Sequence, residues 1–308
     1  MPASTSDLIL HQYDLSPFSE KIRLIFGRKS LEWFACLHPT IMPKPELIAL
    51  TGGYRQIPVL QIGADIYCGT EVIADEIEAL FPDPPLTLLS GAGLGRAFAY
   101  WAEETLFWLV VQVTCGSDFA YCEDDNFNRD REAMLPGLYD VAKMRAEMPA
   151  NVARLRAHLD LVERQLGDGR AFLFGDAPDL VDFSLYLSVE FLGNCRNGNE
   201  KIPGDYPAMG GWLGRVKAIG SGVRQDITRQ EALELARSAV PAPSRASYGK
   251  VGPAIGTEVR FKPWAPSGQI VEGELISSEP RRFAIRRTTA ELGATVVHLP
   301  RSAGDFIT

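Results

Sequence analysis

The sequence predicts three structural units in succession: an α/β domain, an all-α domain and a small β-rich extension. Over residues 7–81, short β-type runs alternate with segments of helical periodicity. From residue 93 the apolar residues recur at helical spacing, and beyond the proline-containing segment 241–244 the runs become β-like again. These changes of period place the units at residues 1–85, 90–235 and 241–308.

The size and charge of the chain narrow its class. With 308 residues, 46% hydrophobic and 23% charged, it has the composition of a globular protein of two domains and a small third one. The net charge of −8 argues against general affinity for phosphate backbones, so we expect no nucleic-acid partner. Residues 241–308 carry nine Lys and Arg against six Asp and Glu, a net charge of +3, whereas the remainder carries −11. The extension is therefore electrostatically distinct from the body.

No membrane partner is expected either. The longest apolar run, residues 106–111 followed by Gln112 and Val113, is far shorter than the roughly 20 residues of a spanning helix. The first ten residues show no basic segment ahead of an apolar stretch, so a secretory leader is not visible and a reducing cytoplasm is favoured.

Cysteine and histidine spacing gives no metal or dithiol motif. No cysteine pair has C-x-x-C spacing, which favours small buried hydrophobes over ligands. The histidines are few and widely separated, so we expect no metal site. The residues concerned are Cys36, Cys68, Cys115, Cys122 and Cys195, and His11, His38, His158 and His298.

The first unit begins with a strand at residues 7–13. Ser16 then supplies a capping side chain, Pro17 fits the first helical position and Glu20 places an acid in the first turn, so a helix starts there. A second strand is predicted at residues 32–37. Because a helix separates the two strands, they should pair in parallel.

After a loop rich in proline and glycine, residues 56–68 predict two short strands joined by a tight turn at residues 63–65. A further helix follows, with Ile73, Ile77 and Leu80 on one face, and the prolines between residues 82 and 85 end it. The order of strand–helix–strand followed by strand–strand–helix is that of thioredoxin-like domains.

The second unit is predicted to be helical throughout. We expect segment 123–132 and the Leu135-Pro136-Gly137 interruption to form an exposed loop or two short helices, and residues 207–219 to form a late helix. Two apolar stripes at helical spacing predict core-facing sides: Leu94, Phe98, Trp101, Thr105, Trp108 and Gln112 in one, and Val152, Leu155, Leu159, Val162 and Leu166 in the other.

In the extension, residues 259–262, 270–276, 283–287 and 295–299 are β-like runs separated by Gly and Pro. Four arginines, at 281, 282, 286 and 287, either form a contact patch or lie on solvated strand faces. The sequence favours the second interpretation.

Three features could carry chemistry. Ser16 lies at a helix start, where unpaired N–H groups and the positive helix end would stabilise a thiolate, although it could equally be a simple cap. Pro58 opens a strand, which is easier to accommodate if the Ile57–Pro58 bond is cis and the backbone of Ile57 faces a ligand; an edge strand is the alternative. Thr70 and Glu71 begin the next helix, where a small zwitterion could bind, and capping is again the alternative.

Together these features resemble the N-terminal domain of cytosolic glutathione transferases. The likeness rests on residues 13–23 (YDLSPFSEKIR), 56–60 (QIPVL) and 69–75 (GTEVIAD). Residues 172–186 (FLFGDAPDLVDFSLY) are similar to the family's interior capping-box segment, which gives Asp179 and Asp182 structural roles. The resemblance reaches about residue 235 and implies a thioredoxin-like domain followed by a transferase-type helical domain. The tail is similar to extensions of some bacterial and fungal transferase-like proteins.

The resemblance also implies which residues bind glutathione, the expected co-substrate. Ser16 would contact the sulfur, and a serine there implies thiol activation for transfer, whereas cysteine would favour mixed-disulfide chemistry. Family members commonly have an acid and a serine where this chain has Gly69 and Thr70; threonine keeps the hydroxyl, and Glu71 is the nearest acid. The implied glutathione-binding residues are Ser16, Gln56, Ile57, Pro58, Gly69, Thr70 and Glu71.

For the acceptor pocket, the resemblance implies the aromatic residues Tyr13, Phe18, Trp101, Phe107 and Trp108. Trp101 and Trp108 share a helical stripe, so core packing is an alternative for both. Tyr13 is the alternative thiol partner, since several classes of the family use a tyrosine hydroxyl on the sulfur.

The expected function is therefore transfer of glutathione to a small hydrophobic electrophile in detoxification, by a cytoplasmic homodimer. Glutathione-dependent isomerisation or dehalogenation remains an alternative reaction. A binding or regulatory protein that kept the fold without turnover is the alternative from another class.

Overall fold

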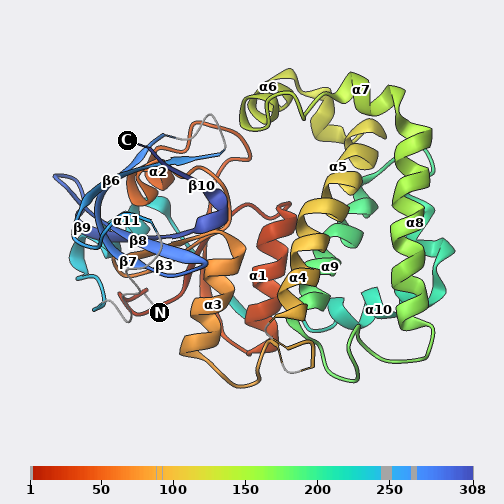
Figure 1. The fold of residues 1–308 in the computed structure, drawn as a ribbon, viewed down its shortest axis with the longest axis horizontal. Coiled ribbons are helices and arrows are strands. Elements are labelled where there is room, and N and C mark those ends of the chain that lie inside the picture. The colour runs from red at the N-terminus through yellow and green to blue at the C-terminus, as the bar shows by residue number, and fades with distance from the viewer. Residues whose placement is uncertain (1–2, 88, 92, 244–251, 265–268, 308) are drawn as a thin grey trace.

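The computed structural model describes residues 3–87, 89–91, 93–243, 252–264 and 269–307. Figure 1 shows a sheet-containing part on one side and a helical part on the other, with α1 and α3 between the sheet and the second set of helices. Of the predicted linker, Pro241 to Pro243 are described and Ser244 lies outside the described residues. None of the helices in these ranges is long and apolar enough to cross a membrane.

The first domain has the predicted thioredoxin-like order. Its elements are β1 (Ile9–Gln12), α1 (Pro17–Arg28), β2 (Glu32–Leu37), α2 (Pro45–Thr51), β3 (Val59–Ile62), β4 (Asp65–Cys68) and α3 (Thr70–Leu80). Strand β1 pairs with β2 in parallel and with β3 antiparallel, and β3 pairs with β4 antiparallel. The sequence missed α2, which begins with Pro45 at its first turn and ends at Gly52 in the left-handed region.

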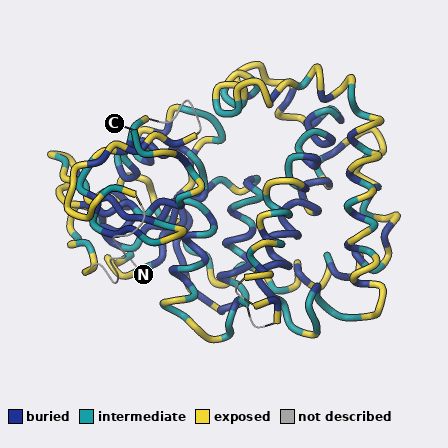
Figure 2. The backbone as a smooth tube through the Cα atoms, viewed as in Figure 1, coloured by how far each residue is buried: buried dark blue, intermediate teal, exposed yellow. Residues whose placement is uncertain are grey.

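The second domain is helical, as predicted. Its elements are α4 (Leu94–Tyr100), the π-helical turn η1 (Trp101–Leu106), α5 (Phe107–Gly116), η2 (Ala120–Glu123), α6 (Asp125–Met134), α7 (Val141–Ala146), α8 (Met148–Leu166), α9 (Leu180–Phe191), η3 (Leu192–Asn194), η4 (Asn199–Asp205) and α10 (Pro207–Lys217). Figure 2 shows the buried backbone concentrated in the sheet and in the helices next to it, while α6 and α7 are largely exposed.

One predicted stripe was wrong. The predicted residues Phe98, Trp101 and Trp108 are only half-buried, and Leu94 is exposed. The fully buried face of this long helix is formed instead by Gly95, Ala99, Ala102, Leu106, Val110 and Val113. Small residues lie on that face because α4 packs directly against α9, where the Ser188 hydroxyl donates to the Ala102 carbonyl at 3.0 Å. The stripe on α8 is confirmed, since four of its five residues are fully buried.

The segment 172–182 fastens α9 as the resemblance implied. Asp179 and Asp182 form a capping box at the start of α9. The Asp182 carboxylate also accepts the N–H of Leu173 at 2.9 Å and the indole N–H of Trp212 at 2.7 Å, so it joins α9 to the preceding loop and to α10. The Asp179 carboxylate accepts the Ser90 backbone N–H at 3.0 Å and thereby holds the connection between the two domains.

The predicted range of the second domain, 90–235, includes a segment that lies on the first domain. Strand β5 (Val223–Ile227) pairs in parallel with β2, and α11 (Arg229–Ser238) packs against β2 and α2. The sequence did not reveal this return because β5 is a short, largely polar strand at the edge of the sheet.

The extension continues the sheet of the first domain. It contains β6 (Glu258–Pro263), β7 (Val271–Ser278), β8 (Arg282–Thr289), β9 (Gly293–Pro300), η5 (Arg301–Ala303) and β10 (Gly304–Ile307). Strand β9 pairs with β4 in parallel, which produces one ten-stranded sheet in the order β10-β6-β7-β8-β9-β4-β3-β1-β2-β5. Val59 and Ile66 share one buried cluster with Phe283 and Val297, so the extension is built into the first domain's core.

The expectation of solvated arginine faces in the extension was wrong for Arg282 and Arg287, which are half-buried, whereas Arg281 and Arg286 are exposed. Arg281 is paired with Asp75 at 2.7 Å, Arg282 with Glu76 at 3.3 Å, and Arg287 donates to the Ala49 carbonyl at 3.1 Å. The positive extension thus neutralises acids of α3, which is where part of the body's excess negative charge lies. Arg286 instead pairs across the strands with Glu274 at an exposed position.

Candidate functional site

The three sequence motifs meet at one edge of the sheet. In the strand register His11 lies opposite Val59, and Val59 lies opposite Cys68. The chain therefore leaves β1 toward Ser16, enters β3 from Pro58 and leaves β4 toward Gly69 at the same edge. This places the start of α1, the residue before Pro58 and the start of α3 around one site.

Ser16 is the N-cap of α1 and is buried. Its hydroxyl oxygen accepts the Ser19 backbone N–H at 3.2 Å, which confirms the capping role. A hydroxyl has one proton to donate in addition to its acceptor lone pairs. Among the described residues no acceptor for that proton lies within hydrogen-bonding distance of Ser16. Capping and donation to a bound anion are therefore compatible, and the two interpretations of Ser16 do not exclude each other.

The peptide bond between Ile57 and Pro58 is cis, as the sequence suggested. Pro58 is buried and stands immediately before β3, while Gln56 and Ile57 are half-buried. Ile57 thus lies at the strand's entry, beside the start of α1, with its side chain against the core shared with the extension.

Gly69 has a structural reason to be glycine. Its φ of +82° lies in the left-handed region, and a Cβ there would lie 3.0 Å from Cγ of Pro300 at the end of β9. A larger residue would therefore need Pro300 to shift by a few tenths of an ångström and would adopt a disfavoured backbone conformation.

Thr70, the first residue of α3, is already engaged in a charged cluster. Its hydroxyl donates to Glu103 at 3.1 Å and accepts from the Lys21 ammonium at 3.4 Å. Lys21 and Glu103 are 2.5 Å apart and both side chains are largely buried. Since Lys21 belongs to α1 and Glu103 to the π-helical turn η1, this ion pair joins the two domains beside the start of α3.

Glu71 lies between the second domain and the extension. Its carboxylate accepts the Tyr100 hydroxyl at 2.5 Å on one oxygen and the Ser302 hydroxyl at 2.6 Å on the other. Burial and the bond to Glu71 raise the pKa of Tyr100 above its usual value. Glu104 is exposed as a residue, but partial desolvation of its carboxyl, with the charges of Glu103 and Glu71, raises its pKa. The start of α3 is therefore surrounded by carboxylates that share few cations.

The predicted acceptor residues do not form one group. Phe18 on α1 and Phe107 on α5 contact each other across the domains, with ring centroids 4.8 Å apart in an edge-to-face arrangement. Trp101 instead packs against Phe98 and His158, at centroid distances of 5.0 and 5.7 Å, toward the interior of the helical domain. Tyr13 and Trp108 are half-buried, and Tyr13 precedes Ser16 in the turn where its carbonyl accepts the Ser16 N–H.

A group of cationic side chains, Lys44, Arg55 and Arg131, lies around Asp130 where the loops of the first domain meet α6. Arg55, two residues before Ile57, is buried and contacts Asp130 of α6 at 2.6 Å. Asp130 also accepts from Arg131 and from the Met42 N–H. Burial, together with the charges of Arg131 and Arg55, lowers the pKa of Lys44 to about 8. These contacts are a second connection between the domains.

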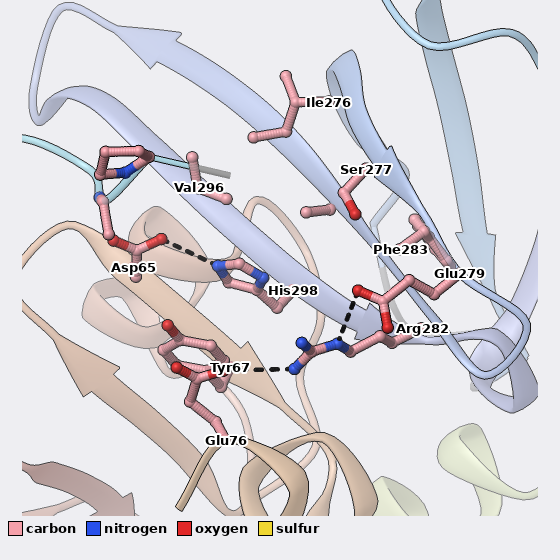
Figure 3. Close-up of a pocket in the computed structure, with 13 residues that line it drawn as sticks. Asp65, Tyr67, Glu76, Ile276, Ser277, Glu279, Arg282, Phe283, Val296 and His298 are labelled. Atoms are coloured by element: carbon pink, nitrogen blue, oxygen red, sulfur yellow. Dashed lines mark hydrogen bonds and ion pairs between the residues drawn. The ribbon is translucent and has the colours of Figure 1, made fainter. Parts of the chain in front are cut away.

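A separate small cavity lies between β4, α3 and the extension (Figure 3). Its volume is about 50 Å³, which leaves room for roughly one or two water molecules. His298 stacks on Tyr67 with centroids 4.3 Å apart and lies 2.9 Å from Asp65, while Arg282 reaches Glu76. The cavity is at the Asp65 end of β4, away from Gly69, and is too small for a tripeptide. We regard it as part of the contact that fixes the extension.

An α/β domain with these three motifs at one sheet edge, followed by a helical domain, defines a glutathione S-transferase fold. Family models described as the N-terminal and the C-terminal domain of glutathione S-transferase match residues 10–85 and 145–215. The crystal structure of a GST-like protein from Pseudomonas syringae is 33% identical, covers 98% of this chain and 99% of that chain, and has a TM-score of 0.77. The chain belongs to the glutathione S-transferase family.

More distant structures support the fold alone. FzlA from C. crescentus is 22% identical, with 69% of this chain and 88% of that chain covered and a TM-score of 0.51. A Tau class glutathione S-transferase from mango is 17% identical, with 76% and 97% covered and a TM-score of 0.52. No curated protein matches the chain. The Pseudomonas syringae protein matches nearly the whole chain, extension included, whereas the mango enzyme does not.

Five residues at the site were not predicted from the sequence: Lys21, Glu103, Tyr100, Pro300 and Ser302. One signal for Lys21 was present, because this charged residue lies three positions after Phe18 and four before Ile25 on the apolar face of α1. Its partner could not have been inferred, since Glu103 is 82 residues away in the chain. The contacts of Pro300 and Ser302 depend on the parallel pairing of β9 with β4, which no sequence pattern specified.

Proposed function

We propose that the protein is a glutathione-dependent transferase that activates the glutathione thiol through Ser16 for attack on a small hydrophobic electrophile. The observation that carries this proposal is the meeting of a free Ser16 hydroxyl proton, the cis-Pro58 turn and the start of α3 at one sheet edge. In the reaction the thiol proton passes to solvent, sulfur forms a bond to the electrophilic carbon, and the leaving group departs with its electron pair.

The positions of the charges support a particular orientation of glutathione. The cysteinyl backbone would pair with Ile57, which places its sulfur near Ser16. The α-carboxylate of the γ-glutamyl end would meet the N-terminus of α3 and Lys21, and its ammonium would meet Glu71 and Glu103. In this arrangement Glu103 supplies the acid that Gly69 lacks. Gln56 lies beside Ile57 as an additional polar contact.

Phe18 and Phe107 are the aromatic residues best placed to contact the acceptor, because each lies on a helix that begins next to the site and their rings touch. Tyr13 and Trp108 remain proposed members of this pocket. Trp101 is the least suited, since its ring contacts Phe98 and His158 instead.

The test is the pKa of the thiol in the bound state, measured by its ultraviolet absorbance as a function of pH. A hydrogen bond from a hydroxyl to a thiolate contributes about 1–3 kcal/mol, so Ser16→Ala should raise the bound-thiol pKa by about 1–2 units. Ser19→Ala is the matched control, because it removes a neighbouring buried hydroxyl that has no hydrogen-bond partner. An unchanged pKa in Ser16→Ala would refute the role, and the same shift in Tyr13→Phe would transfer it to Tyr13.

A second candidate function is a binding or regulatory protein without turnover. It is favoured by Pro300, which leaves little room for a side chain at position 69, and by the hydrogen bonds that Thr70 already makes. Calorimetric titration distinguishes the two: absence of heat at millimolar glutathione favours the regulatory function. If glutathione binds, product analysis separates transfer from isomerisation and reductive dehalogenation.

We further propose that the protein works in the cytoplasm as a homodimer, as is common in the family. Because β9 occupies the edge of β4 and Arg281 and Arg282 contact α3, any partner that approaches this side would contact the extension. Sedimentation analysis of the full chain tests the dimer.

A further inference from the structure

Three metal-ligating side chains meet on the face of the sheet that α11 covers. His11 on β1 lies directly opposite Cys36 on β2 in the parallel register. His38 follows two residues later. Its backbone N–H donates to the Gln12 carbonyl, so the hydrogen bonding between β1 and β2 extends to His38. Since side chains alternate along a strand, all three point to the same face. No sequence motif indicates this group, because its two histidines are 27 residues apart.

The ligand atoms are close to one another and buried. His11 Nδ1 is 3.0 Å from His38 Nε2, and Cys36 Sγ is 3.8 Å from the same nitrogen. All three atoms lie within 4.8 Å of one another. An ion about 2.0 Å from nitrogen and about 2.3 Å from sulfur can bridge two nitrogens up to ~4.0 Å apart and a nitrogen–sulfur pair up to ~4.3 Å apart. Both separations from His38 Nε2 fall inside these limits, whereas the His11 Nδ1–Cys36 Sγ pair, within 4.8 Å, must lie at or below about 4.3 Å in the bound state.

A hydrogen-bond chain orients His11 for ligation. The Gln61 amide nitrogen donates to the carbonyls of Gly63 at 3.0 Å and Ala232 at 2.8 Å, so its oxygen is the acceptor toward His11 Nε2 at 2.9 Å. His11 therefore carries its proton on Nε2 and presents the Nδ1 lone pair to the cluster. Metal-binding histidines are typically fixed by such a bond on the outer nitrogen.

We propose that His11 Nδ1, Cys36 Sγ and His38 Nε2 bind one Cu(I) ion. Thiolate and imidazole ligands suit this soft ion. Without the ion, His38 Nε2 carries a proton and donates it to His11 Nδ1 at 3.0 Å. On binding, that proton moves to His38 Nδ1, the ion replaces the Cys36 thiol proton, and one proton is released for each ion bound.

Charge balance selects a monovalent ion. Cu(I), one thiolate and two neutral imidazoles have no net charge, whereas Zn²⁺ would leave one positive charge buried, which is costly. Zinc would also lack its fourth ligand, since no other Cys, His, Asp or Glu in the described ranges joins the three. The cations of Arg229 and Lys44 face His38, and Glu46 balances only Arg229, at 3.4 Å. A divalent ion is therefore disfavoured on both counts.

The test is anaerobic titration of the full-length protein with Cu(I) against a chromophoric Cu(I) chelator, with X-ray absorption at the copper edge. We expect one equivalent bound, with one sulfur and two nitrogen scatterers, and release of one proton. Cys36→Ser should lower the affinity by about 100-fold or more, because it removes the thiolate ligand. Zn²⁺ should not compete.

The matched control is Cys122→Ser. Cys122 and Cys115 are both near the Tyr139 hydroxyl, at 3.3 and 3.9 Å, and lie outside the proposed site. This variant should still bind one equivalent of Cu(I). The proposal is overturned if Cys36→Ser binds Cu(I) as tightly as the wild type, or if the wild-type spectrum shows two sulfur ligands. It is also overturned if the wild-type protein binds no copper, or if Zn²⁺ displaces the bound Cu(I). The X-ray spectrum of wild-type protein decides the matter even if Cys36→Ser does not fold.

Discussion

Replacing Asp182 tests whether one carboxylate holds three segments of the helical domain together. Its oxygens accept N–H groups of Leu173 at 2.9 Å, Asp179 at 2.9 Å and the Trp212 indole at 2.7 Å. All four residues are fully buried or nearly so. Asp182→Ala leaves three donors without an acceptor, each at about 1–3 kcal/mol, and water in the vacated space offsets part of this. We expect a loss of about 3–6 kcal/mol in the free energy of unfolding.

The graded variants make this result specific. Asp182→Asn keeps one acceptor oxygen but turns an amide toward the Asp179 N–H, so it should lose about 2–3 kcal/mol. Asp176→Ala is the matched control, because this neighbouring aspartate is exposed; it should change stability by less than about 0.5 kcal/mol.

Urea unfolding followed by circular dichroism measures all three variants. The reasoning is refuted if Asp182→Ala unfolds within about 1 kcal/mol of the wild type, or if Asp176→Ala is equally damaging.

Three further predictions concern the site and the extension. Glu103→Gln should weaken glutathione binding by about 5- to 30-fold in calorimetry if Glu103 holds the ammonium; a gain in affinity would show instead that Glu103 competes with the ligand's carboxylate. Lys44→Met should stabilise the protein by about 1–3 kcal/mol at neutral pH, because the lowered pKa means that the folded state releases a proton that the unfolded state retains between about pH 8 and 10.5. The wild-type protein gains stability as pH rises through that window, so the advantage seen in urea midpoints should shrink toward pH ~10.5, and a constant advantage would contradict the account. Arg282→Ala should cost about 1–3 kcal/mol in the same assay, since it removes a guanidinium that pairs with the buried Glu76, whereas Arg286→Ala, at an exposed cross-strand pair, should cost less than about 1 kcal/mol.

Much of the fold could be predicted because local patterns and tertiary structure agree. The strand predicted at residues 32–37 coincides with β2. The helix predicted after Ser16 is α1, for which the cap, the proline and the apolar face all indicate a helix. The strands of the extension were also anticipated, apart from β10. The elements that were not predicted depend on long-range contacts. Strand β5 is polar and is stabilised by pairing with β2, and α2 lies in a segment whose prolines and glycines predicted a loop.

The backbone elements that surround the site could be predicted from the sequence, whereas the charged contacts within it could not. Ser16, Pro58 and Thr70 could be placed because each marks the start of a helix or strand, which is a local property. The Lys21–Glu103 pair could not, because it depends on how one helix of the second domain approaches α1. The burial of that helix was also misjudged, since Gly95 and Ala99 form the inner face although neither is strongly hydrophobic.

The π-helical turn η1 interrupts the helix from Leu94 to Gly116 at the point where Glu103 meets Lys21 of the first domain. A π turn contains one residue more than an α turn, so the phase of the side chains shifts by about 100° at that point. The turn therefore sets the direction of Phe107, the first residue of α5, relative to the α4 side chains that pack on α9. Removal of one residue from Trp101–Leu106 would restore a uniform helix and rotate the entire following half away from Phe18. In this sense a single inserted residue sets which side chains the second domain presents to the first.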